Sequence, residues 1–384
     1  MERPLAGLKV LELARVLAGP WIGQTLADLG ADVVKVESPE GDETRGWGPP
    51  FADDGAAAYF HAANRGKRSI ALDFRNADDA ALARRLAAGA DVVLENFKLG
   101  GLVRYGLDYA AVATTNPAVV YCSITGFGQT GPYAPRAGYD FIIQAMGGIM
   151  DLTGEPGGEA QKPGVAYADL FTGLYGAIAV QAALLMRAHT GRGQWIDMAL
   201  LDCQLAVLAN QATNWLIGGR LPARMGNAHP NIAPYQVFQA ADGPFVLACG
   251  NDGQFAKLCG VLGLDLAADP RFTLNRDRVA NRAALVAALA PALAARSRAD
   301  LLAALEAAGV PAGPINTVAE AFADPQAEAR GMVQEIAGSR APRSPMRFSD
   351  AALAADRAPP RLDADGGAIR AALAAGAAWP AQDN

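Results

Sequence analysis

The sequence predicts an α/β fold in which a parallel, doubly wound sheet is followed by a smaller α+β region. Short apolar strands alternate with helical patterns through the first 125 residues, and this alternation is typical of parallel sheets. From about residue 220 the pattern changes to a hairpin and three helical segments, which indicates a second domain over roughly 220–325. A chain of 384 residues has room for two domains.

The predicted elements of the first half come in alternating order. Strands are expected over Lys9–Leu13, Asp32–Glu37, Ser69–Leu72, Asp91–Leu94, Val119–Thr125 and Trp195–Met198. Helices are expected over Pro20–Leu29, Ala77–Ala88 and, as a single helix, Leu201–Ile217. Residues 38–58 are rich in Gly, Pro and Asp and are expected to form a long loop, and loops of that length tend to be functional or disordered.

The second half begins with a predicted hairpin. Its strands are Gln236–Ala240 and Phe245–Ala248, joined by a turn that contains Asp242-Gly243-Pro244. The elements that follow are helices over Asp252–Leu262, Asn281–Ala295 and Arg298–Ala308, a strand over Met332–Ile336 and an Ala-rich terminal helix.

One helix carries the strongest functional signal. Residues 164–176 read G-V-A-Y-A-D-L-F-T-G-L-Y-G, and the apolar pattern then continues to Arg187. This pattern predicts a largely buried helix of roughly six or seven turns, in which Asp169 lies near the N-terminus. Asp169 has two interpretations: a first-turn carboxylate that complements the helix dipole, or an ionised carboxylate that attacks an acyl carbon. Tyr175 and Gln181 interrupt the apolar run, so we expect a core helix and no membrane span.

Composition and charge exclude several classes of protein. The net charge of −6 gives no reason to expect a nucleic acid or an anionic membrane as partner. The four cysteines form no C-x-x-C pair, so we expect buried thiols in a reducing compartment and neither a zinc site nor disulfides. His61, His189 and His229 are too far apart to suggest a metal site. The opening residues show no signal-peptide pattern, and we expect a cytoplasmic protein.

Two glycine-rich segments each have a functional and a plain interpretation. Residues 126–131 match G-x-G-x-x-G, but the prolines that follow delay the next helix until about Phe141, which argues against a dinucleotide site. Residues 250–255, G-N-D-G-Q-F, follow a strand and precede a helix. They form either a mobile loop that closes over a ligand or a strand-to-helix turn capped by Asp252.

A set of basic residues lies at or near the predicted strand ends and loops of the first sheet. If these side chains converge on the ligand edge of the sheet, they would suit a phosphorylated cofactor. The set is Arg15, Lys35, Arg65, Lys67, Arg68, Arg75, Lys98 and Arg104.

Seven segments, taken together, resemble those of the class III CoA-transferases, a family that also includes the α-methylacyl-CoA racemases. The resemblance covers nearly the whole chain. The segments are V-L-A-G-P (16–20), L-G-A-D-V-V-K-V-E (29–37), N-R-G-K-R-S-I-A-L-D (64–73), D-V-V-L-E-N-F (91–97), S-I-T-G-F-G (123–128), Y-A-D-L-F-T-G (167–173) and T-G-R-G-Q-W-I-D (190–197).

The resemblance implies a Rossmann-like large domain built from both chain ends, a smaller domain, and two chains threaded through each other as an interlocked homodimer. The corresponding boundaries are 1–200 for the large domain, 201–224 for a linker helix, 225–325 for the small domain and 326–384 for the return to the large domain. The resemblance also implies that Asp169 is the nucleophile and that coenzyme A is a substrate, with no permanently bound cofactor and no metal. The residues that it places around CoA are Leu17, Ala18, Leu72–Arg75, Asn96, Phe97, Lys98, Arg104, Arg136 and Tyr139.

The chain departs from some members of the family at two CoA-contacting positions. Ser38 and Ala137 stand where those members have Arg and Lys. Tyr139 stands where the racemases that resemble this family carry a proton-transferring His in G-H-D, and an ordinary phenol is a poor base at neutral pH. We therefore favour the transferase over the racemase.

The resemblance implies a mechanism in which Asp169 attacks an acyl-CoA and passes through an anhydride and an aspartyl-CoA thioester. The backbone N–H groups near Ala18 and at the start of the Asp169 helix are expected to steady the oxyanions. Residues 250–254, with Gly250, Asn251, Gly253 and Gln254, match the mobile glycine loop of the family and are the expected lid.

The segment G-D-E-T-R-G-W-G-P-P at 41–50 looks like the branch of the family that acts on dicarboxylates, with succinyl-CoA as the expected donor. Arg45 and Arg224 are the candidates to bind a distal carboxylate, and a solvated loop arginine is the plain interpretation of each. A CoA-thioester isomerase and a CoA-binding protein without activity remain the alternatives.

Overall fold

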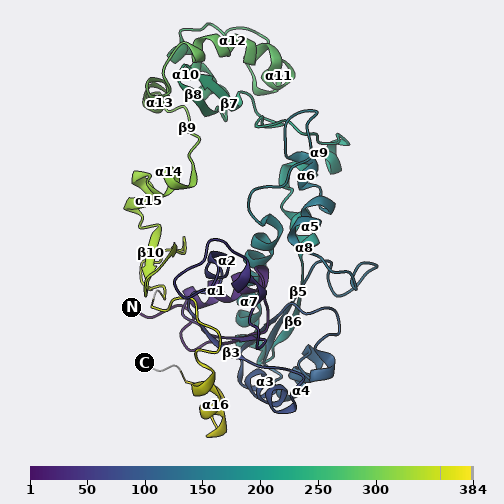
Figure 1. Cartoon of the computed structure of the whole chain (residues 1–384). Helices are drawn as coiled ribbons and strands as arrows, with labels where there is room; N and C mark the ends of the chain where they lie inside the picture. The colour runs from purple at the N-terminus through teal and green to yellow at the C-terminus, as the bar shows by residue number, and fades with distance from the viewer. Residues whose placement is uncertain (355, 382–384) are drawn as a thin grey trace. The chain divides into compact units, whose positions relative to one another are not determined.

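The computed structural model describes residues 1–354 and 356–381 of the chain (Figure 1). The chain forms two compact units. Unit 1 contains residues 1–150, 162–220 and the chain from Glu328 onward, and unit 2 contains residues 151–161 and 221–327.

Unit 1 is built on a six-stranded parallel sheet with the order β3-β2-β1-β4-β5-β6. The central strand β1 pairs with β2 through Val10 and Val33 and with β4 through Val10 and Val92. The predicted α/β fold with a parallel sheet is therefore confirmed. The strands are β1 (Lys9–Glu12), β2 (Asp32–Glu37), β3 (Lys67–Ala71), β4 (Val92–Glu95), β5 (Val120–Thr125) and β6 (Gln194–Ala199).

Helices cover both faces of this sheet because its strands are apolar on both sides. Val10 packs on one face with α1, α5 and α7, and Leu11 packs on the other with α3, α4 and α16. The helices of unit 1 are α1 (Ala18–Asp28), α2 (Ala58–His61), α3 (Ala77–Gly89), α4 (Tyr109–Thr115), α5 (Asp140–Met146), α6 (Ile149–Leu152, which crosses into unit 2), α7 (Tyr167–Thr190), α8 (Leu200–Ala206), α9 (Ala209–Gly218), α15 (Pro325–Ala329, shared with unit 2) and α16 (Gly366–Ala374), with short 3₁₀ turns η1 (Glu43–Gly46) and η2 (Val103–Tyr105).

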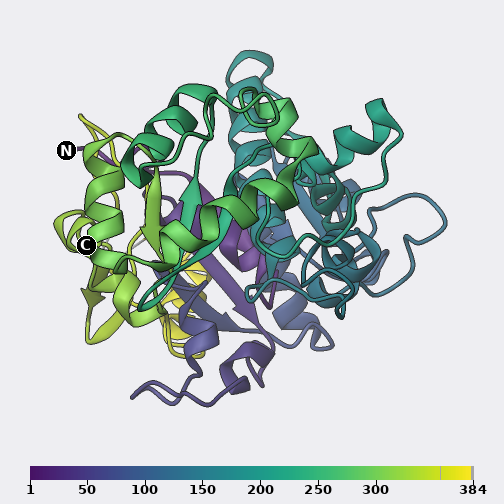
Figure 2. The same cartoon turned by 90° about the horizontal axis from the view of Figure 1, so that it is seen from above.

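The C-terminal part of the chain returns to the N-terminal part, and the yellow and purple segments meet in Figures 1 and 2. The backbone N–H of Asp365 donates to the Ser69 carbonyl of β3, and the Trp379 indole N–H donates to Asp32 of β2. A hairpin of β10 (Val333–Ile336) and β11 (Ser339–Pro342) precedes this contact.

Unit 2 has a core of its own, formed by an antiparallel sheet and the helices around it. Its hairpin pairs Tyr235 with Ala248, and a third short strand joins the second strand. The elements are β7 (Tyr235–Ala240), β8 (Gly243–Ala248), β9 (Ala312–Pro314), α10 (Asp252–Leu262), α11 (Asn275–Ala280), α12 (Arg282–Ala294), α13 (Arg298–Ala307) and α14 (Val318–Phe322).

Several local expectations differ from the structure. The expected helix 201–217 is two helices, because Ala209 has a left-handed φ of 47° that breaks the α-helical path between α8 and α9. The strand expected at 332–336 has a partner, β11, that the sequence pattern did not reveal. Residues 151–161 pack with unit 2, where the N–H of Gly226 donates to the Gly154 carbonyl, although the expected boundary placed them in the large domain.

The predicted long helix around Asp169 is present as α7, but it is not largely buried. Small residues on one face pack against the sheet, and this face contains Ala168, Ala177, Val180 and Ala183. The other face leaves large apolar side chains exposed in the single chain: Leu174, Tyr175, Ile178, Leu185 and Met186.

Candidate active site

A pocket opens at the carboxyl edge of the large sheet. Its lining includes residues 15–18 after β1, 96–99 after β4 and 124–126 at the end of β5. The strand order changes direction between β1 and β4, and ligands of open α/β sheets bind at such a switch point. We call this space, about 140 Å³ in volume, the switch-point pocket.

Asp169 is the third residue of α7 and lines the switch-point pocket. Its residue exposure is only 9%, and within residues 1–354 and 356–381 its carboxylate oxygens have no hydrogen-bond or ion-pair partner. Burial, followed by the charge of Asp140, raises the pKa of Asp169 to about 7. A carboxylate without partners, held where a ligand can reach it, is suited to nucleophilic attack.

The start of α1 lies against the Asp169 face of α7. Gly173 is one turn after Asp169 on the same face, and a Cβ there would come within 2.9 Å of Trp21 Cβ and 3.1 Å of the Ala18 carbonyl. Gly176, one turn further, meets Ile22 of α1 in the same way. The two glycines allow the helices to approach closely, so the first residues of α1 and the Asp169 carboxylate share one pocket.

Asp140 occupies the free N–H groups at the start of α7. Its Oδ1 accepts from the backbone N–H of Ala168 at 2.9 Å and of Asp169 at 3.3 Å, while its Oδ2 accepts from Gln144 at 2.7 Å. The helix start below Asp169 was an expected oxyanion site, and this expectation is wrong for these two N–H groups because Asp140 takes them. Leu17 and Ala18 at the start of α1 line the pocket, and their N–H groups have no acceptor within the described residues.

Close backbone packing brings Tyr139 and Asp140 to the pocket. A Cβ on Gly126 would meet the Cα of Gly138 at 2.5 Å, so the two chain segments can touch only with glycine at these positions. Gly126 and Gly138 therefore have a packing role. The next helix, α5, begins only at Asp140, close to the late start that argued against a dinucleotide site.

A second pocket, about 430 Å³ in volume, adjoins the first and shares Arg15 and Phe97 with it. Phe74 contributes an aromatic wall, with its ring 6.3 Å from that of Phe97 and 5.5 Å from that of Tyr105. The remaining lining comes from Leu13, residues 35–42, Leu72, Asp73 and Arg75. Together the pockets form a site in which one part is lined by aromatic rings and charged side chains of both signs and the other contains the buried carboxylate of Asp169.

Comparison with known proteins identifies the family of this chain. Residues 5–366 match the CoA-transferase family III. The chain belongs to this family.

Individual relatives of this CoA-transferase are similar over almost their full length. It is 55% identical to the succinate–glutarate CoA-transferase of Agrobacterium fabrum, over 94% of this chain and 93% of that protein. It is 42% identical to the succinyl-CoA:glutarate CoA-transferase of Mus musculus, over 94% of this chain and 84% of that protein. A crystal structure of a CAIB/BAIF family protein from Brucella suis superposes with a TM-score of 0.88 at 65% identity, covering 97% of this chain and all of that one.

Most residues that the sequence assigned to CoA binding line one of the two pockets of this CoA-transferase. Leu17, Ala18, Arg136 and Tyr139 line the switch-point pocket with Asp169, and Leu72 and Arg75 line the second pocket. Asn96, Phe97 and Lys98 line the switch-point pocket as well. Arg104 lies outside both linings and places its guanidinium over the Tyr105 ring at 4.6 Å. These placements are compatible with CoA contacts, and the contacts themselves stay a prediction.

The basic residues near the sheet do not converge on the ligand edge as a set. Lys35 and Lys67 are fully buried and pair with Glu12, while Arg65 and Arg68 pair with carboxylates inside unit 1. The sequence pattern could not separate these four from exposed cations, because their partners lie 23 to 55 residues away in the chain. Of the remaining four, Arg15 and Lys98 reach the switch-point pocket.

Both candidates for a distal carboxylate site already pair with a carboxylate of this chain, although Nε of Arg224 is buried without a partner among the described residues. Arg45 donates to both oxygens of Glu37, at 2.7 and 2.8 Å, and also to the Pro360 carbonyl, so it serves the fold of unit 1. Arg224 of unit 2 donates to Asp151 at 2.9 Å. The pairing with Glu37 makes Arg45 a structural residue of unit 1, and binding of a distal carboxylate by Arg45 or Arg224 stays a prediction.

The glycine loop of unit 2 forms an ordinary helix start. Asn251 accepts from the N–H of Gln254 at 2.9 Å and is the N-cap of α10, and the Gly250 N–H donates to the Gln254 side chain at 2.7 Å. The expected cap, Asp252, instead pairs with the buried Arg278 at 2.6 Å. Gly253 follows Asp252 in the first turn of α10, and closure of the loop stays a prediction.

Other features of the described residues bear on cofactors and membranes. In residues 1–354 and 356–381, no three His, Cys, Asp or Glu side chains are grouped so that they could hold a metal ion. All four cysteines are buried free thiols, as expected. By length and composition alone α7 could span a membrane, but a core helix passes the same test, and the close contact of Gly173 and Gly176 with α1 favours a core helix.

Sequence reasoning missed Asp140 and Asp42. Asp140 follows Tyr139 directly, and its role depends on the approach of α5 to α7, which no local pattern reports. Asp42 stands in D-E-T, where an Asp two residues before a Thr is typical of an Asx turn, and its carboxylate does accept from the Thr44 N–H at 3.0 Å.

Proposed function

We propose that this enzyme transfers CoA from succinyl-CoA to a dicarboxylate, with Asp169 as the covalent carrier. The observation that carries the proposal is the buried carboxylate of Asp169, which has no partner among the described residues and shares a pocket with the start of α1. The choice of succinyl-CoA and a glutarate-like acceptor rests on the activities for which the relatives from Agrobacterium fabrum and Mus musculus are named.

The transfer takes four displacement steps. An Asp169 oxygen attacks the thioester carbon of succinyl-CoA, and the C–S bond breaks to give a mixed anhydride and CoA thiolate. The thiolate attacks the aspartyl carbon, which frees succinate and leaves an aspartyl-CoA thioester. The acceptor carboxylate displaces the thiolate to form a second anhydride. The thiolate then attacks the acceptor's acyl carbon and restores Asp169 as a carboxylate.

Each attack places negative charge on a carbonyl oxygen beside Asp169. The backbone N–H groups of Leu17 and Ala18 at the start of α1 are the donors we propose for this charge, because they line the same pocket and have no acceptor among the described residues. The anhydride and the thioester are both prone to hydrolysis, so the filled site must exclude water. The loop at 250–254 is our candidate for the lid.

The two pockets suggest how CoA is held. Its thioester end must reach Asp169 in the switch-point pocket. We propose that its nucleotide end enters the second pocket, where Phe74 can stack and the exposed Arg75 can turn from Asp73, 2.9 Å away, to a phosphate. Ser38 lines the second pocket and donates to the Gly41 carbonyl, so an arginine found there in some relatives has no equivalent. Arg136 lines the switch-point pocket beside Ala137 and is our candidate for the missing lysine.

Intact mass spectrometry after mixing with succinyl-CoA tests this function. We expect a covalent CoA adduct on the wild-type protein that hydroxylamine removes and that Asp169→Asn does not form. A panel of dicarboxylates that discharge the adduct then identifies the acceptor. An adduct with a different acyl-CoA only would contradict the donor.

The alternatives give different outcomes. A racemase would exchange the Cα proton of a 2-methylacyl-CoA with solvent deuterium and form no adduct. A binding protein without activity would bind CoA esters and show neither adduct nor exchange.

We further propose that two chains form an interlocked homodimer and that the reaction takes place in the cytoplasm. The exposed apolar face of α7, where Ile178 is 62% and Leu185 is 70% exposed, supports a second copy as its cover. Light scattering should give twice the chain mass, and Ile178→Lys with Leu185→Lys should reduce it. Tagged and untagged dimers that are truly interlocked should exchange subunits only after unfolding, and rapid exchange under native conditions would contradict the threading.

A further inference from the structure

Val16 has a backbone conformation that its side chain disfavours. Its φ is +72°, in the left-handed region, and a β-branched residue there is a genuine outlier. Val16 immediately precedes Leu17 and Ala18, which line the switch-point pocket with Asp169 and whose N–H groups have no acceptor among the described residues. The direction of those N–H groups therefore depends on whether Val16 stays in its strained conformation.

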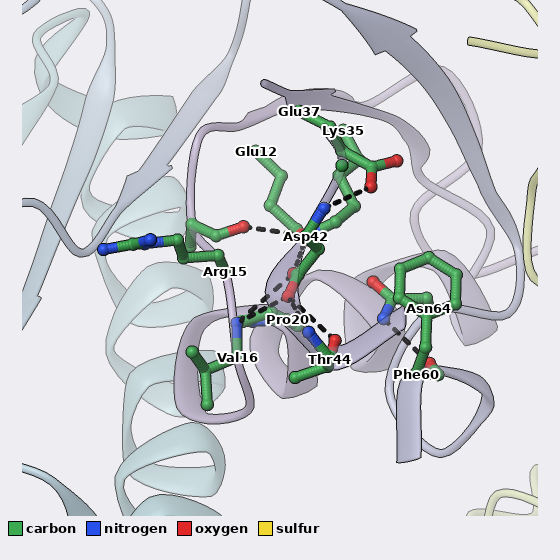
Figure 3. Close-up of polar contacts among 12 residues, drawn as sticks. Glu12, Arg15, Val16, Pro20, Lys35, Glu37, Asp42, Thr44, Phe60 and Asn64 are labelled. Atoms are coloured by element: carbon green, nitrogen blue, oxygen red, sulfur yellow. Dashed lines mark hydrogen bonds and ion pairs between the residues drawn. The ribbon is translucent and has the colours of Figure 1, made fainter. Parts of the chain in front are cut away.

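A buried carboxylate holds Val16 in place. The Val16 N–H points between the two oxygens of Asp42, at 3.4 and 3.3 Å (Figure 3). Asp42 is itself fixed, because its Oδ1 accepts from the N–H and the hydroxyl of Thr44 at 3.0 and 2.8 Å. Its Oδ2 lies 2.9 Å from Nζ of Lys35, and both side chains of this ion pair are fully buried.

Two buried cations, Lys35 and Lys67, hold the chain on both sides of Val16. Lys35 donates to the Ala14 carbonyl at 2.8 Å, and Lys67 donates to the Pro20 carbonyl in the first turn of α1 at 2.9 Å. Asn96 holds Arg15 through two backbone hydrogen bonds, of 3.0 and 2.7 Å, but it does not reach Val16. Among the described residues, Asp42 is the only acceptor for the Val16 N–H, so the hydrogen bonds on either side do not replace it.

We propose that Asp42, oriented by Lys35 and Thr44, is a positioning residue for the reaction: it holds Val16 in its left-handed conformation so that the Leu17 and Ala18 N–H groups face the carbonyl that Asp169 attacks. The proposal rests on the covalent role of Asp169 proposed above. Asp42 lines the second pocket and not the switch-point pocket, and its fully buried carboxylate is occupied by Lys35 and Thr44. Its effect is expected on the rate of the chemical step and not on the binding of CoA.

The test compares Asp42→Asn, Val16→Gly and the double variant by the rate of CoA adduct formation. In Asp42→Asn, the introduced amide would place an N–H against either Lys35 or Thr44, so the side chain can no longer receive all its donors. We expect Asp42→Asn to lower the maximal rate by about 100-fold while the half-saturating succinyl-CoA concentration changes less than about threefold.

The double variant separates positioning from a general effect on the fold. Glycine adopts a positive φ freely, but Val16 itself lines the switch-point pocket, so Val16→Gly alone is measured as the baseline for the double variant. In the Asp42→Asn background, Val16→Gly should raise the rate about tenfold above that of Asp42→Asn alone. Glycine needs no hydrogen bond from Asp42 to keep a positive φ. A double variant as slow as Asp42→Asn, or slower, would overturn the proposal.

Asp28→Asn is the matched control. Asp28 is buried to a similar degree and pairs with Arg65 at 2.6 Å, but it lies outside the switch-point pocket and does not contact residues 14–18. Asp28→Asn removes the charge of a buried ion pair elsewhere in unit 1 and should leave the adduct rate unchanged. An equal loss of rate in Asp28→Asn would show that any damage to the buried ion pairs slows the enzyme, which also overturns the proposal.

If Asp42→Asn does not fold, Thr44→Val tests the same proposal. It removes one donor to Asp42 and keeps the ion pair with Lys35, so we expect a smaller loss of rate that Val16→Gly again reverses. Failure of the wild-type protein itself to form an adduct would contradict the proposed function, whereas wild-type adduct formation with a normal rate in both Asp42→Asn and Thr44→Val would contradict only the positioning role.

Discussion

Buried carboxylates in unit 1 differ in whether they are paired, and their pKa values shift in opposite directions. Among the described residues Asp169 forms no ion pair, although Arg15, Lys98 and Arg136 line the same pocket, and burial together with Asp140 raises its pKa to about 7. Asp42 and Glu37 are buried as deeply. Burial opposes their ionisation too, but Lys35, with Thr44 at Asp42 and Arg45 at Glu37, outweighs it and holds the pKa of each below its usual value.

The difference separates the carboxylate that we propose as the nucleophile from the carboxylates that hold the fold. A buried carboxylate that is fully paired is a poor nucleophile, because an attack would have to break its hydrogen bonds and ion pairs. A buried carboxylate without partners is reactive, but its ionised form costs stability. Ionised Asp169 therefore lowers the stability of the folded state, while the paired carboxylates stabilise the neighbouring segments.

The largest expected effect is that of Asp169→Asn, which tests whether the unpaired carboxylate is the reactive one. We expect adduct formation and turnover to fall by at least about 10⁴-fold, because the amide is not a nucleophile. Stability should not fall. The raised pKa of Asp169 means that the folded state keeps a proton that the unfolded state loses between pH 3.8 and about 7, so the wild type loses stability as pH rises through this window.

Denaturant unfolding at pH 8 checks the stability half of this prediction, with the wild type at pH 5 as the reference. The variant should be at least as stable as the wild type at pH 8. A clear loss of stability in Asp169→Asn would mean that its carboxylate is paired and structural.

The second prediction concerns the structural side and uses Lys35→Met. Removal of this cation leaves Asp42 buried without its ion pair, and we expect a loss of about 3–5 kcal/mol in the free energy of unfolding at pH 7. The same denaturant experiment measures it, and Asp169→Asn is the control of opposite sign. A loss below about 1 kcal/mol would show that the buried cluster is not what holds this region.

The third and smallest effect is a shift in pH dependence. Because Asp140 contributes to the raised pKa of Asp169, Asp140→Asn should move that pKa to lower pH. The amide oxygen can still accept from the start of α7, and Gln144 can turn its unpaired Oε1 toward the new N–H.

The measurement is the second-order rate of adduct formation against pH at low succinyl-CoA concentration. In the wild type the rate should rise with pH through about 7 as Asp169 ionises, and in Asp140→Asn the rise should come at lower pH. An unchanged midpoint would assign the raised pKa to burial alone.

The local pattern of the sequence was enough to predict the sheet and to single out Asp169, and the resemblance to the family implied that Asp169 is the nucleophile. Alternating apolar strands and helices can pack only as a parallel sheet with both faces covered, and the Asp169 segment stands out because a single charge lies in a long apolar run. The resemblance to the family added the CoA-binding segments, most of which line the two pockets.

Only the tertiary structure decided which charges pair. Lys35 and Arg45 looked like exposed cations in the sequence, but each meets a carboxylate that the fold brings from another strand or loop. The strain at Val16 and the capping of α7 by Asp140 also depend on contacts between segments distant in the chain. A local pattern reports which side chains are apolar and how often they recur, whereas the partner of a buried charge is set by the packing of whole elements.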